Sequence, residues 1–418
     1  MIVGLDIGTS KTCVAVGERD EQGNLQITGM GLSPSTGIRK GVVVNIEATL
    51  NSIAAAVEAA EFMCGADVHN CWTGIGGTHV DGINSRGVVT VSGKNRETRE
   101  IDQDDLGRVL QLAQEISIPL DRQILEVIPQ SYIVDGQKGI RNPLDMLGVR
   151  LEAEVHIITC SSTSAQNLIK CVNRAGFHVE DLVLQSLAAG RSVLTEEEKE
   201  MGVALIDMGG GTTELLVYSD GALCFIASIP VGSELISRDI SAIKSISFDS
   251  AEKVKIEAGC CWEGLLGNDE IRDGEVIISG LGGRPTVPIP RTHILKIARP
   301  RVEEIYRMVK EKLDKQIFPR PIGAGLVLTG GGASLPGAAE LASYIFDMPV
   351  RVGNPLPMPG LAEEYRGPMY ATAIGLALEG NDRRNYRSEE RGRDILGNIK
   401  GGSRWGLGKM FDWLKDVF

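Results

Sequence analysis

Residues 3–16 read VGLDIGTSKTCVAV, and residues 204–217, about half a chain later, read ALIDMGGGTTELLV. Each stretch is an apolar run that ends in an aspartate, followed by a glycine-rich turn and a second run of β-favouring residues. A pattern repeated at this distance predicts two similar lobes that face each other across a cleft. A single hairpin of this kind is as easily explained by chance, but the pair argues against coincidence.

The second run in each stretch predicts a hairpin rather than a strand followed by a helix. In P-loop and Rossmann motifs a helix follows the glycines, and its N-terminus holds the phosphates. Here β-favouring residues continue, so the backbone N–H groups and hydroxyls of the turn would face an anion. Asp6 and Asp207, at the strand ends, are placed to hold Mg²⁺ through water. The phosphate-binding residues expected from the two turns are Gly8, Thr9, Ser10, Lys11, Gly209, Gly210, Gly211, Thr212 and Thr213.

A third glycine cluster, LTGGGASLPG at residues 328–337, follows the apolar run 324–328. Adjacent glycines after a strand let the backbone pass close to a flat base or a ribose. A GGG run is weak evidence alone and gains weight as the third such loop in one chain. We therefore expect a nucleoside to contact Gly330, Gly331, Gly332 and Ser334.

The bulk composition excludes several classes of protein. A length of 418 residues favours two or more lobes, and 43% hydrophobic residues are ordinary for a globular protein. A net charge of −12 argues against a nucleic-acid partner, which needs a basic surface. We expect no signal peptide, no membrane-spanning run of 18 apolar residues and no C-x-x-C metal or redox site. These observations predict a cytoplasmic protein unless another feature holds it to a membrane.

The three glycine clusters resemble those of the superfamily that contains actin, heat-shock chaperones and sugar kinases. The resemblance implies an α/β architecture, the actin-like (ribonuclease H-like) two-lobed ATPase fold, with ATP and Mg²⁺ in the cleft. It also implies two connecting helices, which match residues 181–190 and 370–378. Relatives carry Glu or Gln nine residues before the glycine of the first helix, where the side chain orients the attacking water. Asp181 holds that position as the candidate catalytic residue, and its shorter side chain predicts slow hydrolysis.

A helix that contacts adenine and ribose in this superfamily resembles residues 251–255, AEKVK. At i, i+3 spacing Glu252 and Lys255 share one face of such a helix. A solvated ion pair is the alternative interpretation of the same two residues.

Other phrases resemble one family within this superfamily. VIPQSY at 127–132, GIRNP at 139–143 and GVRLEA at 148–153 occur in the order found in the inserted subdomain of FtsA, the actin-like bacterial cell-division family. RKGVVVN at 39–45 and GLGGRP at 280–285 are also similar to that family. The insertion has no cluster of His or Cys, which favours an interaction module over a catalytic one.

The FtsA resemblance implies a peripheral protein on the cytoplasmic face of the inner membrane, at the division septum. Such a protein tethers FtsZ filaments, polymerises with itself and recruits later division proteins through the inserted subdomain. It is at most a weak ATPase, with a mainly structural and regulatory role. In this family the small subdomain of the second lobe binds the C-terminal tail of FtsZ, and Arg299 and Arg301 are our candidates for pairing with an acidic peptide. The alternative is that both arginines flank Pro300 at the start of a helix and are only solvated.

The expected domain organisation follows from these matches. We expect the first lobe at 1–78 and 156–180, with 346–379 returning to it, the inserted subdomain at 79–155, the core of the second lobe at 181–240 and 301–345, its small subdomain at 241–300, a flexible linker at 380–402 and an amphipathic helix at 403–418.

The end of the chain predicts a membrane anchor. Residues 380–402 are charged, contain glycine and have few large apolar groups, which is typical of a disordered linker. Residues 403–418, at 100° per residue, place their apolar side chains on one arc and their charged ones opposite. A core helix shows similar periodicity but seldom follows a linker or carries so much Trp and Phe, so we expect an interfacial helix on anionic lipid. Its apolar arc consists of Trp405, Leu407, Met410, Phe411, Trp413, Leu414, Val417 and Phe418.

Two other functions are also compatible with the sequence. One is another actin-like membrane scaffold, of the MreB or PilM type, although MreB lacks the insertion and PilM lacks the long tail. The other is an ATP-dependent small-molecule kinase, for which no motif supplies a catalytic base or a second-substrate pocket.

Overall fold

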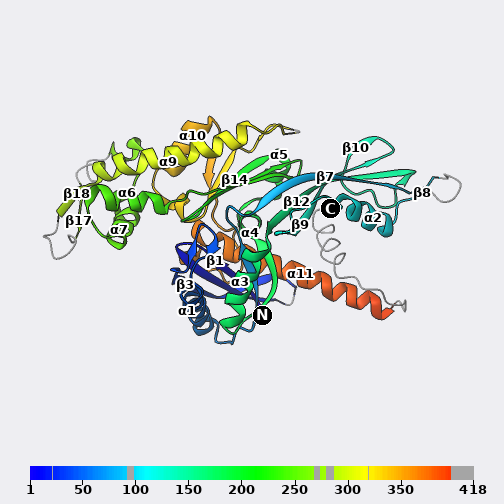
Figure 1. Ribbon diagram of the computed structural model, residues 1–418, viewed down its shortest axis with the longest axis horizontal. Helices are drawn as coiled ribbons and strands as arrows, with labels where there is room; N and C mark the ends of the chain where they lie inside the picture. The colour runs from blue at the N-terminus through cyan, green and yellow to red at the C-terminus, as the bar shows by residue number, and fades with distance from the viewer. Residues whose placement is uncertain (21, 92–97, 268–273, 279–286, 319, 397–418) are drawn as a thin grey trace.

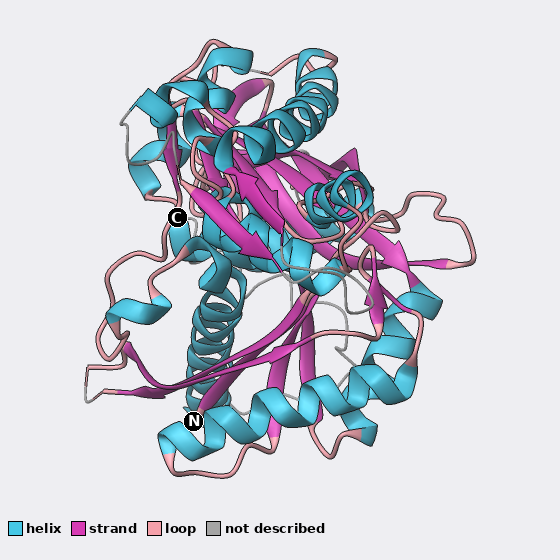
Figure 2. Cartoon of the chain, turned by 90° about the vertical axis from the view of Figure 1, so that its left-hand side faces the viewer, coloured by secondary structure: helices cyan, strands magenta, loops and turns pink. Residues whose placement is uncertain are grey.

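Two five-stranded sheets with equivalent strand orders form the two lobes in a computed structural model of the protein (Figure 1). The structure describes residues 1–20, 22–91, 98–267, 274–278, 287–318 and 320–396. Layers of helix and strand alternate through the molecule (Figure 2). This architecture confirms the actin-like α/β fold expected from the sequence.

The sheet of the first lobe is buried on both faces. Its strands, in the order β13-β6-β1-β2-β3, are His178–Leu184, Asn70–Ile75, Ile2–Ile7, Lys11–Arg19 and Leu25–Pro34. Helices α1 (Ile46–Cys64) and α3 (Ser162–Arg174) supply buried residues to the core on one face, and α4 (Gln185–Val193) and α11 (Ala371–Leu396) to the core on the other. Burial on both faces explains why β1 reads as a nearly continuous apolar run.

The second lobe repeats this plan. Its sheet has the order β16-β15-β14-β19-β20, with bounds Ala222–Ile229, Thr213–Ser219, Val203–Met208, Leu326–Thr329 and Val350–Val352. In both lobes the strand that ends in aspartate pairs antiparallel with the next strand and parallel with a later one. Asp6 lies opposite Cys13 and Asp207 opposite Glu214, so the registers of the two hairpins also correspond. The internal repeat predicted from the sequence is therefore confirmed.

The helices of the second lobe cover its sheet and build its small subdomain. They are α5 (Glu196–Met201), α6 (Glu234–Lys244), α7 (Phe248–Ala258), α9 (Arg291–Asp314) and α10 (Ala338–Phe346). A two-stranded sheet of β17 (Glu275–Ile278) and β18 (Val287–Pro290) completes the small subdomain.

The inserted subdomain is a four-stranded antiparallel sheet with one helix against it. Its strands β10-β9-β12-β7 are Gln137–Ile140, Arg122–Val134, Arg150–Ser161 and Asp81–Thr90, and a small pair joins β8 (Arg99–Glu100) to β11 (Leu147–Gly148). Helix α2 (Gln103–Ala113) begins at a capping box in which Asp102 and Asp105 each accept a backbone N–H of the other residue. The two acidic side chains thus satisfy backbone N–H groups that would otherwise have no partner at the helix start.

Several expected domain boundaries fall inside single elements. Residues 156–160 were expected to open the return to the first lobe, but they belong to β12, which pairs with β7 and β9 of the insertion. The boundary 180/181 cuts β13 of the first lobe, and the boundaries 240/241 and 300/301 cut α6 and α9. Apolar runs mark strands well, but only pairing decides which sheet a strand joins.

The prediction of a flexible linker at 380–402 is wrong for residues 380–396, because α11 continues to Leu396. Four consecutive side chains beyond residue 380 anchor this helix. Arg19 donates to the side chain of Asn381 at 2.8 Å, and Arg191 pairs with Asp382 at 2.7 Å. Arg383 is paired with Glu379, Glu126 and Asp181, and Arg384 with Glu180. Composition suggested a linker because these charges look solvated in the sequence, whereas their partners lie far away along the chain. Residues 397–402 lie outside the described residues.

The two lobes meet where α4 crosses α11. A Cβ at Gly375 would lie 1.7 Å from the carbonyl oxygen of Ala188, so the two backbones pass in direct contact. Both connecting helices are present, but the first begins only at Gln185 because residues 181–184 belong to β13, and the second begins at Ala371. Among the described residues, no helix is both long enough and apolar enough to span a membrane.

We predict that Gly375→Ala destabilises the protein even though alanine favours a helix over glycine by about 1 kcal/mol. The added methyl group would force α4 and α11 apart, and overpacking of this kind costs about 1–3 kcal/mol. Urea denaturation measures the difference. Gly367→Ala is the matched control, because its Cβ would have no neighbour closer than 3.9 Å. Equal or higher stability of Gly375→Ala would show that the crossing is not tight.

Candidate functional site

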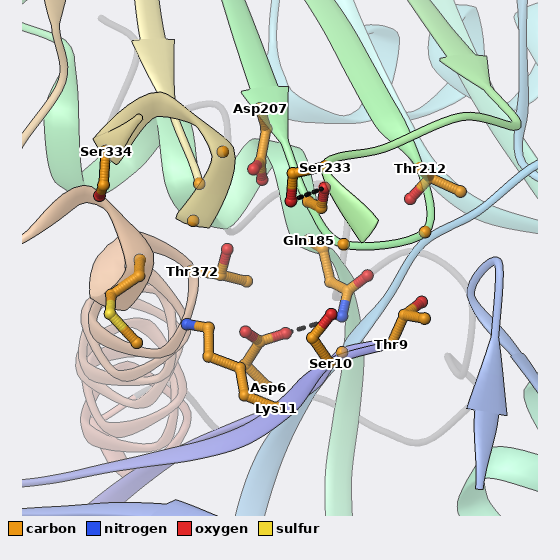
Figure 3. Close-up of a pocket in the computed structure, with 18 of the residues that line it drawn as sticks. Asp6, Thr9, Ser10, Lys11, Gln185, Asp207, Thr212, Ser233, Ser334 and Thr372 are labelled. Carbon is orange, nitrogen blue, oxygen red and sulfur yellow. Dashed lines mark hydrogen bonds between the residues drawn. The ribbon is translucent and has the colours of Figure 1, made fainter. Parts of the chain in front are cut away.

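A cavity of about 540 Å³ lies between the lobes and is lined by all three glycine loops. Asp6, Ser10 and Lys11 come from one lobe and Asp207 from the other, with Ser334 and Thr372 nearby (Figure 3). The sequence therefore identified residues that tertiary folding does bring together. Of the predicted phosphate-, metal- and nucleoside-binding residues, all line this cavity except Thr213.

The two phosphate-loop candidates are the same turn built twice. The amide of Gly8 donates to the carbonyl of Lys11 at 2.9 Å, and the amide of Gly209 donates to the carbonyl of Thr212 at 3.0 Å. The turns also touch each other, since a Cβ at Gly210 would lie 2.0 Å from Ser10 Oγ. Glycine is required there because the loops of opposite lobes approach to contact distance.

The third loop closes the cavity beside the second strand end. It is the 3₁₀ turn Gly331–Ser334, entered through Gly330 at φ +79°. A Cβ at Gly330 would lie 2.2 Å from Asp207 Oδ1, so any side chain there would displace the carboxylate. The left-handed φ and the close approach both explain the glycine.

The cavity wall concentrates negative charge. Burial raises the pKa of Asp6, and Lys11 opposes this shift. Burial, together with the charges of Glu214 and Asp6, raises the pKa of Asp207 to about 7. The described residues contain no cluster of three side chains that could hold a metal by themselves.

Glu252 and Lys255 are an ion pair at the edge of the cavity. They form an ion pair, with Lys255 Nζ 2.8 Å from Glu252 Oε1, and both line the cavity. The Lys255 side chain is only 12% exposed, so the pair is not simply solvated. Helix α7 thus presents a charged edge to the cavity.

The assignment of Asp181 as catalytic is wrong on geometry. Asp181 lies in strand β13, does not line the cavity and pairs with Arg383 at 3.0 Å. The residue that reaches the site is Gln185, the first of α4, whose Nε2 donates to Asp6 Oδ1 at 2.7 Å. Counting nine residues back from Gly190 passes the start of α4 and reaches strand β13, so the expected position fell on Asp181. The length of the side chain at position 181 therefore has no bearing on the rate of hydrolysis.

Thr213 and Glu214 point to opposite faces of β15, and only one of them faces the cavity. Thr213 is buried and donates to the carbonyl of Val231 at 2.8 Å, because alternate residues of β15 point to opposite faces. Its neighbour Glu214, which the sequence analysis missed, lines the cavity instead. In the sequence, Glu214 follows a glycine–threonine turn at the second position of a strand, and this position could have identified it as a residue of the site.

The proposed peptide-binding arginines lie inside helix α9, not at a helix start. Arg301 forms a forked pair with Asp239 at 2.7 and 3.0 Å and also contacts Glu304. Arg299 pairs with Glu303 at 2.8 Å. Both side chains are about one-quarter exposed, so neither is free in solvent. The predicted membrane arc, from Trp405 to Phe418, lies outside the described residues.

Comparison with known proteins identifies the family of this chain. It is 45% identical to the cell division protein FtsA of Borreliella burgdorferi, over 92% of this chain and 92% of that protein. The chain belongs to the FtsA family. FtsA of Pseudomonas aeruginosa is 40% identical over 97% of both chains, and FtsA of Escherichia coli is 34% identical over the whole of this chain. Residues 204–375 match the family described as cell division protein FtsA, and residues 77–159 match the SHS2 domain inserted in FtsA.

Solved structures support the same fold. The PilM–PilN type IV pilus biogenesis complex matches with a TM-score of 0.64 at 16% identity, covering 91% of this chain and 98% of that one. MreB5 of Spiroplasma citri bound to ADP matches with a TM-score of 0.54 at 14% identity, covering 95% and 98%. At these identities the likeness establishes the actin-like fold alone. Membership of the FtsA family sets aside the MreB and PilM alternatives.

The raised pKa of Asp207 leads to a prediction about folding stability. The pKa of this carboxyl is about 7 in the folded protein and 3.8 in the unfolded chain, so the protein becomes less stable as pH rises from about 4 to 7. The side chain of the Asp207→Asn variant cannot ionise. Without nucleotide and above pH 7, we therefore expect the free energy of unfolding of this variant to exceed that of wild type by about 1–2 kcal/mol. Urea denaturation at pH 5, 6, 7 and 8 measures the difference, which should grow up to pH 7 and then level. A difference independent of pH would contradict the raised pKa.

Proposed function

We propose that the protein binds ATP and Mg²⁺ in the interlobe cavity and tethers FtsZ filaments to the cytoplasmic face of the inner membrane at the division septum. It would polymerise through its actin-like body, recruit later division proteins through the inserted subdomain and be at most a weak ATPase. The observation that carries the proposal is the cavity itself, with three glycine loops and two strand-end aspartates, in a chain of the FtsA family.

The residues present fit ATP and Mg²⁺. The glycine turns of both lobes line the cavity between Asp6 and Asp207, where phosphates would lie and would accept from turn N–H groups that are not used within the turns. Mg²⁺, when bound, supplies positive charge that neutralises phosphates and carboxylates together. Its presence would lower the cost of ionising Asp207, whose pKa is raised without it. The loop at Gly331–Ser334 and the pair Glu252–Lys255 would then border the nucleoside.

Gln185 is the residue placed to orient water at the phosphate end. Its amide nitrogen donates to Asp6 Oδ1 at 2.7 Å and approaches the carbonyl of Ile7 at 3.4 Å. A carboxamide can hold a water but cannot remove its proton at neutral pH, which is consistent with slow turnover.

We predict that Asp207→Ala weakens ATP binding by about tenfold or more in the presence of Mg²⁺, equivalent to 1.4 kcal/mol. Titration with a fluorescent ATP analogue measures the affinity. Because Asp207 would act through the cation, the difference from wild type should shrink when EDTA removes Mg²⁺. Asp104→Ala, an exposed acid on α2, is the matched control. Equal affinities of Asp207→Ala and wild type would overturn the assignment of the site.

The FtsZ tail would bind the small subdomain of the second lobe by ion-pair exchange. An acidic peptide can offer Arg301 the same forked contact that Asp239 makes now. Arg299, stacked 5.7 Å over Trp262, offers a second charge beside an aromatic surface. Competition with internal carboxylates favours a modest affinity, which suits a tether that must release.

The predicted amphipathic segment at 403–418 would supply the membrane contact. We expect Trp413→Glu to release the protein from vesicles, because it places a charge on the apolar arc and removes a large interfacial ring. Lys409→Ala should weaken binding much less, by about 1 kcal/mol on an anionic surface. Vesicle sedimentation compares the two variants, with circular dichroism to confirm folding. Release of the wild type by salt alone would show that the apolar arc is not the anchor.

Sedimentation with FtsZ filaments, with lipid vesicles and with both, each with and without ATP, tests the whole proposal. We expect FtsZ to pellet with vesicles only when the protein is present. A steady turnover of a small metabolite with ATP would instead favour the kinase alternative.

A further inference from the structure

The chain enters the inserted subdomain across the edge of the nucleotide cavity. Strand β6 of the first lobe ends at Ile75, and β7 of the insertion begins at Asp81. Between them lie Gly76 and Gly77, and a Cβ at Gly76 would lie 2.3 Å from Gln185 Oε1 and 2.8 Å from Glu214 Oε1. This link therefore rests directly on two side chains that line the cavity.

Glu214 connects the link to the opposite lobe. It belongs to β15 of the second lobe, and its Oε1 accepts the amide of Gly77 at 2.9 Å. The Glu214 side chain is 5% exposed and lines the cavity beside Asp207. One buried carboxylate thus faces the phosphate end of the cavity and holds the entry to the insertion.

The charges around Glu214 make this contact sensitive to what fills the cavity. Burial raises the pKa of Glu214 and Asp6 adds to the shift, while hydrogen bonds from the Ser186 hydroxyl and from the amides of Gly77 and Ser186 oppose it. A cation between Asp6 and Asp207 would attract this carboxylate, and a phosphate would repel it. In a buried site either change alters how strongly Glu214 accepts the Gly77 amide.

Movement at Gly77 would reach the whole inserted sheet. Strand β7 pairs with β12 at every position from Asp81 to Thr90, so a shift at its start is carried along the ladder. On its other side the insertion is held to the second lobe away from the cavity. Arg141 contacts Glu200 and donates to the carbonyl of Asp220 at 3.1 Å, and Gln130 donates to the carbonyl of Leu223 at 2.9 Å. These contacts can serve as a pivot.

We propose that Glu214 is a positioning residue that couples occupancy of the phosphate end of the cavity to the position of the inserted subdomain, through the amide of Gly77. The proposal rests on the proposed binding of ATP. It gives the cavity a route to the surface where other division proteins would dock, without requiring hydrolysis.

Hydrogen–deuterium exchange on the full chain tests the coupling. Amides from Gly77 to Thr90 are followed with and without a non-hydrolysable ATP analogue and Mg²⁺, and the occupancy of each variant is measured separately with a fluorescent analogue. In wild type we expect nucleotide to change exchange in this segment by about 3–10-fold, the range of one hydrogen bond. Compared at equal occupancy, Glu214→Ala should lose this response.

Two further variants keep the test decisive. Glu214→Gln retains a carbonyl acceptor for Gly77 but has no charge, so it should protect that amide without nucleotide and respond less than wild type. Arg141→Ala removes the distant contacts with Glu200 and with the carbonyl of Asp220 but leaves the Gln130 contact, and it should respond as wild type does. A full response in either Glu214 variant, or its loss in Arg141→Ala alone, would overturn the coupling route. Wild type that is fully occupied but unresponsive would also overturn it, whereas wild type that binds no nucleotide would overturn the proposed ATP site as well.

Discussion

The contact between α4 and α11 sets the distance between the two lobes. Gly375 stands where α11 passes the backbone of Ala188, and no side chain fits between them. Helix α11 packs on β1 and β6 of the first lobe, whereas α4 contacts both lobes, at β6 and β13 of the first and at β14 and β15 of the second. Because α4 joins the two lobes and α11 is fixed to the first, their crossing contributes to how closely Asp6 and Asp207 face each other. The cavity depends on this packing as much as on the residues that line it.

The cavity brings together charged groups that do not stabilise the folded protein when no ligand is bound. Asp6, Asp207 and Glu214 are carboxylates withdrawn from bulk water, and the pKa of each is raised. Their main neighbouring cation is Lys11, which opposes the shifts of Asp6 and Asp207. A binding site commonly departs from the arrangement that best stabilises the fold. Here the departure favours a ligand that brings a divalent cation, with glycine turns to receive the accompanying anion.

The inserted subdomain is held by long-range polar contacts at both ends. On one side Arg383 pairs with Glu126 of the insertion, Asp181 of the first lobe and Glu379 of its own helix. On the other side Arg141 reaches Glu200 in the second lobe. The insertion is thus attached to both lobes and to the helix that leads toward the chain end. Any change in the angle between the lobes must be accommodated at these contacts.

Features that local chemistry controls could be predicted from the sequence. The two hairpins, the strand-end aspartates and the glycine turns follow from residues that are neighbours along the chain, because turns are local structures. Which distant groups meet depends instead on the packing of the whole fold. This packing placed Gln185 rather than Asp181 at the cavity, turned Glu214 inward and Thr213 away, gave residues 156–160 to the inserted sheet, and extended α11 through residues that composition assigned to a linker. The deciding partners lie beyond the local stretch, 18 residues away for Thr213 and 179 for Gln185, so burial and pairing are set by the packed fold, and only Glu214 carried a local signal.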